Sequence, residues 1–148
     1  MRSFPKLPVV GVGAVVLDAD RVLLVKRGHE PLKGTWSLPG GVVELGESLQ
    51  AALARELREE TTLAVEVGPI VDVFERIERA SDGRVAYHYV VVDYLCRVRE
   101  GVPAHGSDVD DARWVDRGDL AAYRLTEKTT AVIEKAFRLR QPLGFQSR

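Results

Sequence analysis

Two adjacent glycines, Gly40 and Gly41, followed by a run of strong helix formers constrain the fold of this chain more than any other stretch. The residues after Ser48 are mostly Ala, Leu, Glu and Arg, which favour helix, and Ser48 itself is a suitable N-cap. Leucines recur every four residues and would form a buried stripe. These leucines are Leu49, Leu53 and Leu57. The pattern predicts an extended segment that ends at the glycines, followed by an amphipathic helix.

Three carboxylates, Glu56, Glu59 and Glu60, stand at positions i, i+3 and i+4 of this helix. Like charges at that spacing repel each other, so the cluster does not stabilise a purely structural helix. A hard divalent cation such as Mg²⁺, which prefers oxygen ligands, would make the arrangement favourable. The alternative is a solvated helix face on which Arg55 pairs with Glu59 at i+4.

The spacing of the fixed residues resembles the signature of the Nudix hydrolase family. Gly41 is followed after five residues by Glu47, and after seven more by the run Arg55-Glu56-Leu57-x-Glu59-Glu60-x-x-Leu63. A motif with this many fixed positions is far more specific than a short glycine loop. The resemblance covers essentially the whole chain. It implies the fold of the family, an α/β/α sandwich with a central mixed β-sheet.

One position departs from the signature, because Thr62 stands where the family has glycine. A glycine just after a helix usually supplies a left-handed C′ residue, a conformation that strains a β-branched side chain. Either the helix ends differently here, or Thr62 adopts the unfavourable conformation. No residue with a ligand group is lost, so the departure affects the helix end and not the chemistry.

Length and composition are those of one globular domain covering residues 1–148. Hydrophobic residues make up 45% and charged residues 29% of the 148, and the net charge is −1. No basic surface of the kind that binds nucleic acid is expected. A single cysteine, the absence of an apolar leader and the absence of a membrane-length segment favour a cytoplasmic protein. Residues 1–8 are expected to form an N-terminal arm, and residues 141–148 a frayed tail.

The remaining hydrophobic pattern predicts strands with few helices. Two strands buried on both faces are expected at 9–17 and 21–27, with a polar loop at 28–37. Further strands are expected at 65–67 and 70–75, interrupted at Gly68-Pro69, and Ser81-Asp82-Gly83 is expected to turn a hairpin between 74–79 and 84–98. Residues 101–111 read as loop, 112–115 as a short strand and 119–123 as a short helix. Thr126 is expected to cap a last helix that ends before Gln141-Pro142.

The resemblance implies which residues carry the chemistry. Nudix enzymes hydrolyse a nucleoside diphosphate linked to another moiety, by attack of water at a phosphorus of the diphosphate bridge. Three glutamates, Glu56, Glu59 and Glu60, match the metal ligands of the family, and a carbonyl of Gly40 or Gly41 is a further oxygen ligand. The cofactor is expected to be Mg²⁺, with Mn²⁺ as a substitute, and two or more ions could hold the attacking and leaving oxygens together.

The resemblance also assigns supporting residues. Glu47 matches the upstream glutamate of the signature, and Arg55 is expected to orient Glu59. The catalytic base is a signature glutamate in some relatives and an acid of a downstream loop in others. That loop offers Asp108, Asp110 and Asp111 here, with Asp108 preferred as an extra ligand or base; the alternative is that these are ordinary loop residues. Arg27, at the end of a strand, is expected to contact phosphate or else to be exposed.

Several points of likeness outside the signature are shared with small ADP-ribose pyrophosphatase-type members. They are residues 11–16, 34–41, 87–89 and 111–115. The substrate implied is ADP-ribose or a related nucleotide sugar. The alternatives are a nucleoside triphosphate pyrophosphatase that releases pyrophosphate, and a ligand sensor without catalytic activity, which would be expected to lack signature carboxylates. A homodimer is compatible with the sequence.

Overall fold

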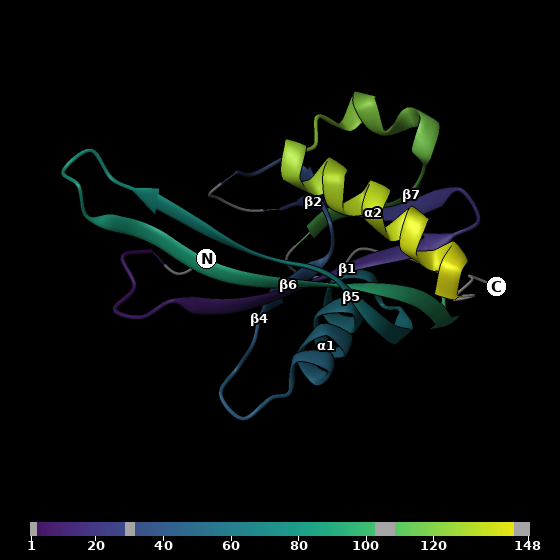
Figure 1. The fold of residues 1–148 in the computed structure, drawn as a ribbon, viewed down its shortest axis with the longest axis horizontal. Helices are drawn as coiled ribbons and strands as arrows, with labels where there is room; N and C mark the ends of the chain where they lie inside the picture. Colours follow the sequence, from purple (N-terminus) through teal and green to yellow (C-terminus); the bar gives the residue numbers. More distant parts are fainter. Residues whose placement is uncertain (1–2, 29–31, 103–108, 144–148) are drawn as a thin grey trace.

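The centre of the molecule is a seven-stranded mixed β-sheet (Figure 1). The computed structural model describes residues 3–28, 32–102 and 109–143. The strands are β1 (Val9–Asp18), β2 (Arg21–Arg27), β3 (Trp36–Ser37), β4 (Gly40–Val42), β5 (Ala64–Arg79), β6 (Val85–Glu100) and β7 (Val109–Asp116). Their order is β3-β2-β1-β6-β5, with β4 also paired to β1 and β7 to β2. Because β1 and β6 are parallel while β5 and β6 are antiparallel, the sheet is mixed.

Two helices cover opposite faces of this sheet, α1 (Leu49–Thr61) below it and α2 (Glu127–Leu143) above it in Figure 1. Each helix closes its own hydrophobic cluster. Leu53 and Leu57 of α1 pack with residues of β1 and β6 on one face, and Ile133 and Phe137 of α2 pack with residues of β1 and β2 on the other. This arrangement confirms the expected α/β/α sandwich. In the part of the chain that is described, no helix is long and apolar enough to cross a membrane.

The first two strands are buried on both faces, as the sequence predicts. On β1, Ala14 belongs to the cluster under α1 and Val15 to the cluster under α2, and both are fully buried. The position of Gly13 on β1 leaves no room for a side chain. A Cβ atom there would stand 2.2 Å from Oδ1 of Asp93 on the neighbouring β6. Gly13 therefore serves the close packing of β1 against β6.

Several strand boundaries differ from the prediction. The segment 28–37 read as loop contains β3, and the glycine pair belongs to β4. Strand β7 begins at Val109, three residues before the expected strand, within the segment read as loop. Strand β5 continues through Gly68-Pro69 with a shift in register between Val67 and Ile70. Proline is tolerated there because β5 is an edge strand, so the N–H group that proline lacks is not needed for a hydrogen bond to a further strand.

The predictions of helices and turns agree better with the structure than those of strand boundaries. Thr126 caps α2, since its hydroxyl accepts a hydrogen bond from the Thr129 N–H at 3.1 Å. The helix continues to Leu143, so the expected end before Gln141-Pro142 is wrong. In a last turn, proline removes only one hydrogen bond. The short helix expected at 119–123 is the later part of a 3₁₀ helix, Arg117–Tyr123. Gly83, with a φ of 88°, turns the predicted hairpin.

The end of α1 resolves the two alternatives for Thr62. Its φ is 63° and its ψ is 5°, which is the left-handed conformation, and its N–H donates to the Arg58 carbonyl at 3.0 Å. The helix thus ends as it would with glycine, and the β-branched side chain bears the strain. A left-handed conformation costs a residue with a Cβ atom roughly 1–2 kcal/mol.

Replacing Thr62 with Gly is therefore expected to raise the free energy of unfolding by about 1 kcal/mol. For a chain of this size the melting temperature should rise by about 2–4 °C. The matched control is Arg58→Gly, an exposed position of the same helix, where glycine should cost about 1 kcal/mol. Chemical denaturation measures the free energy of unfolding of the two variants, and thermal denaturation measures their melting temperatures. If Thr62→Gly were as destabilising as the control, relief of strain would be refuted.

Candidate active site

The face of α1 that points away from the core carries the charged residues of the signature. Ser48 begins the helix, with its hydroxyl accepting a hydrogen bond from the Ala51 N–H at 3.1 Å. Leu53 and Leu57 then bury one face completely. Arg55 and Glu56 lie on the side that faces β4, and both are partly buried. The amphipathic pattern of the helix thus places the signature against the glycine strand.

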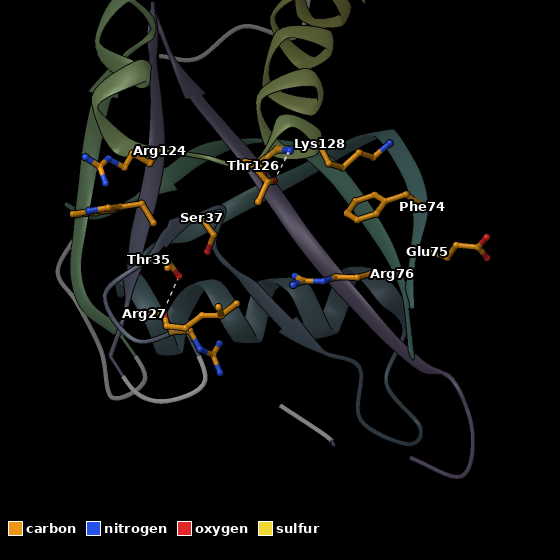
Figure 2. Close-up of a pocket in the computed structure, with 12 residues that line it drawn as sticks. Arg27, Thr35, Ser37, Phe74, Glu75, Arg76, Arg124, Thr126 and Lys128 are labelled. Atoms are coloured by element: carbon orange, nitrogen blue, oxygen red, sulfur yellow. Dashed lines mark hydrogen bonds between the residues drawn. The ribbon is translucent and has the colours of Figure 1, made fainter. Parts of the chain in front are cut away.

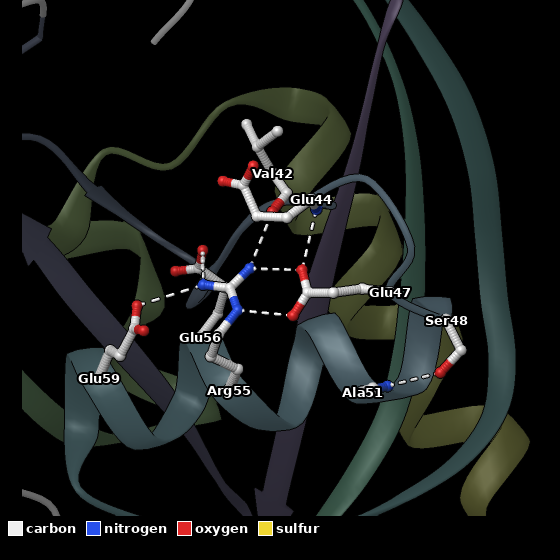
Figure 3. A network of polar contacts seen from close by, with 8 residues as sticks. All are labelled: Val42, Glu44, Glu47, Ser48, Ala51, Arg55, Glu56 and Glu59. Atoms are coloured by element: carbon white, nitrogen blue, oxygen red, sulfur yellow. Dashed lines mark hydrogen bonds and ion pairs between the residues drawn. The ribbon is translucent and has the colours of Figure 1, made fainter.

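Arg55 is the centre of this site (Figure 3). Its Nε and Nη2 donate to the two carboxylate oxygens of Glu47 at 2.7 and 2.9 Å. Its Nη1 donates to Glu56 at 2.9 Å and to Glu59 at 3.3 Å. Its Nη2 also donates to the Val42 carbonyl at 3.1 Å. One guanidinium therefore holds three glutamates and the end of β4. The expected contact between Arg55 and Glu59 is confirmed, and contacts with Glu47, Glu56 and the Val42 carbonyl are added to it.

The pairing with Glu47 is strong because the two planar groups meet through two parallel hydrogen bonds. The hydrogen bonds from Arg55, followed by the one from the Glu44 N–H, lower the pKa of Glu47 from 4.5 to about 2. The same contact with Glu47 raises the pKa of Arg55. Glu47 is ionised at neutral pH, and its two carboxylate oxygens accept the hydrogen bonds of the Arg55 guanidinium. In this arrangement its role is to position the guanidinium.

This pairing predicts a pH dependence of stability. A carboxylate whose pKa is lowered on folding stabilises the fold above its unfolded pKa and loses that contribution as the pH falls. The advantage of the wild type over Glu47→Gln in free energy of unfolding should therefore shrink between pH 4.5 and about 2. Urea unfolding at a series of pH values measures it. The control is Glu134→Gln on the exposed face of α2, which removes a carboxylate without touching the pairing of Glu47 with Arg55. A constant difference for Glu47→Gln would contradict the pairing.

The glycine pair makes close contact with Glu60 and with Glu56. The Gly40 N–H donates to Oε1 of Glu60 at 2.8 Å. A Cβ atom on Gly41 would stand 2.3 Å from the carboxyl carbon of Glu56. Absence of a side chain at Gly41 thus leaves the space that the Glu56 carboxylate occupies. The glycines of the signature and its glutamates are parts of one packed unit.

The three predicted metal ligands are not yet gathered around one point. Among the described residues, no group of three His, Cys, Asp or Glu side chains is placed to hold a metal ion. Glu56 and Glu59 converge on Nη1 of Arg55, whereas Glu60 is buried and turned toward Gly40. The donors are nevertheless all hard oxygen atoms, the type that Mg²⁺ prefers. The residues therefore fit a magnesium site built on Glu56 and Glu59.

The remaining predicted site residues are distributed differently. Arg27 lines a cavity together with Thr35 and Ser37. Asp108 lies outside the described residues, and Asp110 is in β7 without a described side chain. Asp111 is occupied locally, accepting from the Ala112 N–H at 2.8 Å and pairing with Arg113 at 2.8 Å. Of the three downstream acids, Asp111 is thus a structural residue of β7.

A cavity of about 790 Å³ opens between β5, the segment around β3 and the start of α2 (Figure 2). Its walls come from the end of β2, from residues 35–37 around β3, from β5 and from the start of α2. They include four cations, Arg27, Arg76, Arg124 and Lys128, together with the rings of Trp36 and Phe74 and the hydroxyls of Thr35, Ser37, Thr126 and Thr129. The segment 35–41 thus lines the cavity at one end and touches the glutamates at the other.

Sequence reasoning missed the cavity residues of β5 and α2. Phe74 and Arg76 are two residues apart on one strand, and Lys128 lies across the ring of Phe74 at 4.8 Å while pairing with Asp72 at 2.6 Å. The alternation along β5 could have indicated that Phe74 and Arg76 share a face. Nothing in the sequence indicated that α2, more than fifty residues later, would start above them.

Comparison with known families decides the identity of this unit. The profile described as NUDIX domain matches residues 7–136. The chain belongs to the Nudix family. Glu47 and the glutamates of α1 around Arg55 therefore belong to the Nudix signature, together with the glycines of β4.

Named relatives fall within the same family. A Methanocaldococcus jannaschii protein named ADP-ribose pyrophosphatase is 33% identical over 76% of this chain, and the match spans 64% of that protein's own length. The crystal structure of a MutT NUDIX hydrolase from Burkholderia pseudomallei is 32% identical with a TM-score of 0.76, covering 88% of this chain and 98% of its own. The NUDIX domain of Shewanella oneidensis NrtR, solved with ADP ribose, is 26% identical with a TM-score of 0.71 over 91% and 90%.

Proposed function

We propose that this protein is a metal-dependent pyrophosphohydrolase that cleaves the diphosphate bridge of ADP-ribose or a related nucleotide sugar. The observation that carries the proposal is the array of Glu47, Glu56 and Glu59 around Arg55. The segment 35–41 connects this array to a cavity with cations and aromatic rings, since Ser37 lines the cavity and Gly40 contacts Glu60. The cavity volume of about 790 Å³ falls in the range of small-molecule sites. The M. jannaschii relative named ADP-ribose pyrophosphatase and the NrtR domain solved with ADP ribose support the choice of substrate.

The metal would be Mg²⁺, or Mn²⁺ in its place, held first by Glu56 and Glu59. Glu60 and the Gly40 carbonyl would complete the site once the Glu60 carboxylate turns away from the Gly40 N–H. When bound, two or more such ions neutralise the diphosphate and activate or orient water. The chain's own contribution is positioning. Arg55 holds two of the carboxylates side by side before a metal arrives, and Glu47 holds Arg55. Preorganised groups of this kind lower the barrier because they need not reorganise during the reaction.

The substrate would occupy the cavity with its nucleoside or sugar end. Arg27 is suited to a phosphate oxygen because a guanidinium can donate two parallel hydrogen bonds. The rings of Trp36 and Phe74 offer apolar surface, and the hydroxyls of Thr35 and Ser37 offer hydrogen bonds to ribose. Asp108 remains our candidate for an additional ligand or base from the downstream loop.

The test is a hydrolysis screen with Mg²⁺ or Mn²⁺ across ADP-ribose, other nucleotide sugars, dinucleoside polyphosphates and nucleoside triphosphates, with products identified by mass. AMP and ribose 5-phosphate from ADP-ribose are the expected products, and chelation should abolish their formation. A preference for triphosphates would replace the proposed substrate, since a relative named putative 8-oxo-dGTP diphosphatase is 28% identical. Binding of ADP-ribose in calorimetry without turnover of any compound would overturn the enzymatic proposal in favour of a sensor.

A further inference from the structure

The outer edge of β5 is open to another strand. β5 is the last strand in the order of the sheet, and in the described part of the chain only β6 pairs with it. Figure 1 shows the tip of the β5–β6 hairpin extending to the left, beyond both helices. Residues 75–79 near this tip are all exposed. An exposed edge presents unpaired N–H and C=O groups that can form hydrogen bonds with a further strand.

The charges on this edge are arranged so that two copies of the strand, paired antiparallel, would place each charge opposite one of the other sign. The sequence Glu75-Arg76-Ile77-Glu78-Arg79 alternates acid and base on either side of a central isoleucine. In an antiparallel pair of two identical strands related by a two-fold axis at Ile77, Glu75 lies opposite Arg79 of the partner subunit. Arg76 then lies opposite Glu78 of the partner subunit. The two-fold axis repeats both contacts, so every charge meets its opposite.

We propose that a second copy of this chain binds at the β5 edge, by antiparallel pairing of residues 74–80 about a two-fold axis at Ile77. The pairing continues the sheet from one subunit into the other. Opposite-charge pairs facing each other across two strands stabilise the pairing. A symmetric dimer uses the same surface on both subunits, so it closes and leaves neither of these edges open.

The charges also select this register over its neighbours. A shift of one residue in one direction places Glu75 opposite Glu78 of the partner subunit. The same shift in the other direction places Arg76 opposite Arg79 of the partner subunit. A parallel pairing in register would place each charge opposite its own copy. Like charges directly opposite each other destabilise a strand pair, so only the register centred on Ile77 satisfies all four.

Apolar surface on the hairpin supports the same interface. Ile77 is 47% and Val73 54% exposed. By the alternation along the strand, both lie on the face of the sheet opposite Arg76. At the centre of the pair, Ile77 would pack against Ile77 of the partner subunit. On the other face, the existing contact of Arg76 with Glu78 at 2.6 Å would join its copy in the partner subunit, giving a group of four charges of alternating sign across the two strands.

The dimer would also place a second chain next to the cavity. Phe74, Glu75 and Arg76 line the cavity and belong to the paired segment. Because the two-fold axis is perpendicular to the sheet, both cavities lie on the same face, on either side of the seam. The strand that supplies Arg76 to one cavity would thus be held in place by the partner subunit.

The proposal is tested by measuring the mass in solution by light scattering over a dilution series. The wild type should have twice the chain mass of 16.4 kDa at the higher concentrations. Glu75→Arg and Arg79→Glu should each be monomers, because each variant places like charges opposite each other twice. An equimolar mixture of the two variants should return to the doubled mass, since each strand then meets its complement.

The mixture is the decisive arm, because Arg79→Glu also removes a hydrogen bond to the Gly83 carbonyl within its own hairpin. A variant damaged only in its own fold would not be rescued by mixing. The matched control is Arg138→Glu, the same change at an exposed position of α2, which should keep the mass of the wild type. A monomeric wild type, a dimer that both reversals leave intact, or variants that stay monomeric when mixed would each overturn the proposal. None of these readouts depends on catalysis.

Discussion

Replacing Glu59 with Gln is expected to lower kcat by about three orders of magnitude while leaving the fold intact. The side chain of Glu59 is 51% exposed, and its contact is with Nη1 of Arg55 at 3.3 Å. The amide keeps the size and could still accept a hydrogen bond from Arg55, but it removes the negative charge that a divalent cation requires. Stability should therefore change little, whereas metal-dependent turnover should nearly vanish.

The measurement combines steady-state kinetics at saturating metal with thermal unfolding. The matched control is Glu66→Gln, another partly exposed glutamate that pairs with an arginine, here Arg97 at 2.6 Å on β6. That variant loses a similar ion pair away from the signature and should keep its turnover. If Glu59→Gln retained turnover near that of the control, the assignment of the site would be wrong.

Replacing Gly40 with Ala is expected to have the largest effect on stability. A Cβ atom there would stand 2.1 Å from the Val12 carbonyl oxygen and 2.8 Å from the Gly13 Cα atom. Both are backbone atoms of β1, which is paired to β4 and to β6 and cannot move aside. Forcing an extra methyl group into such a position costs about 3 kcal/mol, which corresponds to a melting temperature about 10 °C lower.

The neighbouring Gly41→Ala is the matched comparison, because its Cβ atom meets a side chain. The nearest atoms belong to the Glu56 carboxyl group, at 2.3–2.6 Å. This group sits at the end of a flexible side chain, so it can swing away while the backbone stays in place. We expect a fold close to that of the wild type but a kcat about 10²-fold lower, since the carboxylate is displaced by an ångström or more.

Thermal unfolding and kinetics on both variants distinguish the two roles of the glycine pair. The change at Gly40 should lower mainly the melting temperature, and the change at Gly41 mainly kcat. Equal losses of stability would show that the contact of Gly41 with Glu56 is structural. A fully active Gly41→Ala enzyme would show that the position of Glu56 is unimportant, which would contradict its proposed role as a metal ligand.

The local sequence was sufficient to predict the helix and its signature. Ser48 as N-cap, the buried stripe through Leu53 and Leu57, and the left-handed alternative for Thr62 are all found in the structure. These features depend on residues three to four positions apart, so the physics that decides them is contained in a short segment. The same holds for the hairpin turn at Gly83, which needs only a residue that tolerates a positive φ.

Strand boundaries were less predictable, because pairing partners decide them. β3 and β4 are strands of two and three residues, too short to show an alternating pattern, and they exist because β2 and β1 pair with them. Pro69 interrupts the hydrophobic pattern of β5 in the sequence, but the strand itself continues past it, because β5 is an edge strand.

What the sequence by itself determined is the family, the helix and the identity of the charged residues. Only the tertiary structure decided where those charges are directed. Glu60 turns to the Gly40 N–H and not to Glu56, and Arg55 gathers Glu47 from eight residues away. The cavity needs Arg76 of β5 and Lys128 of α2, which the parallel pairing of β1 with β6 and the packing of α2 bring together. The physical reason is that side-chain contacts between distant segments depend on the sheet order, which no local pattern encodes.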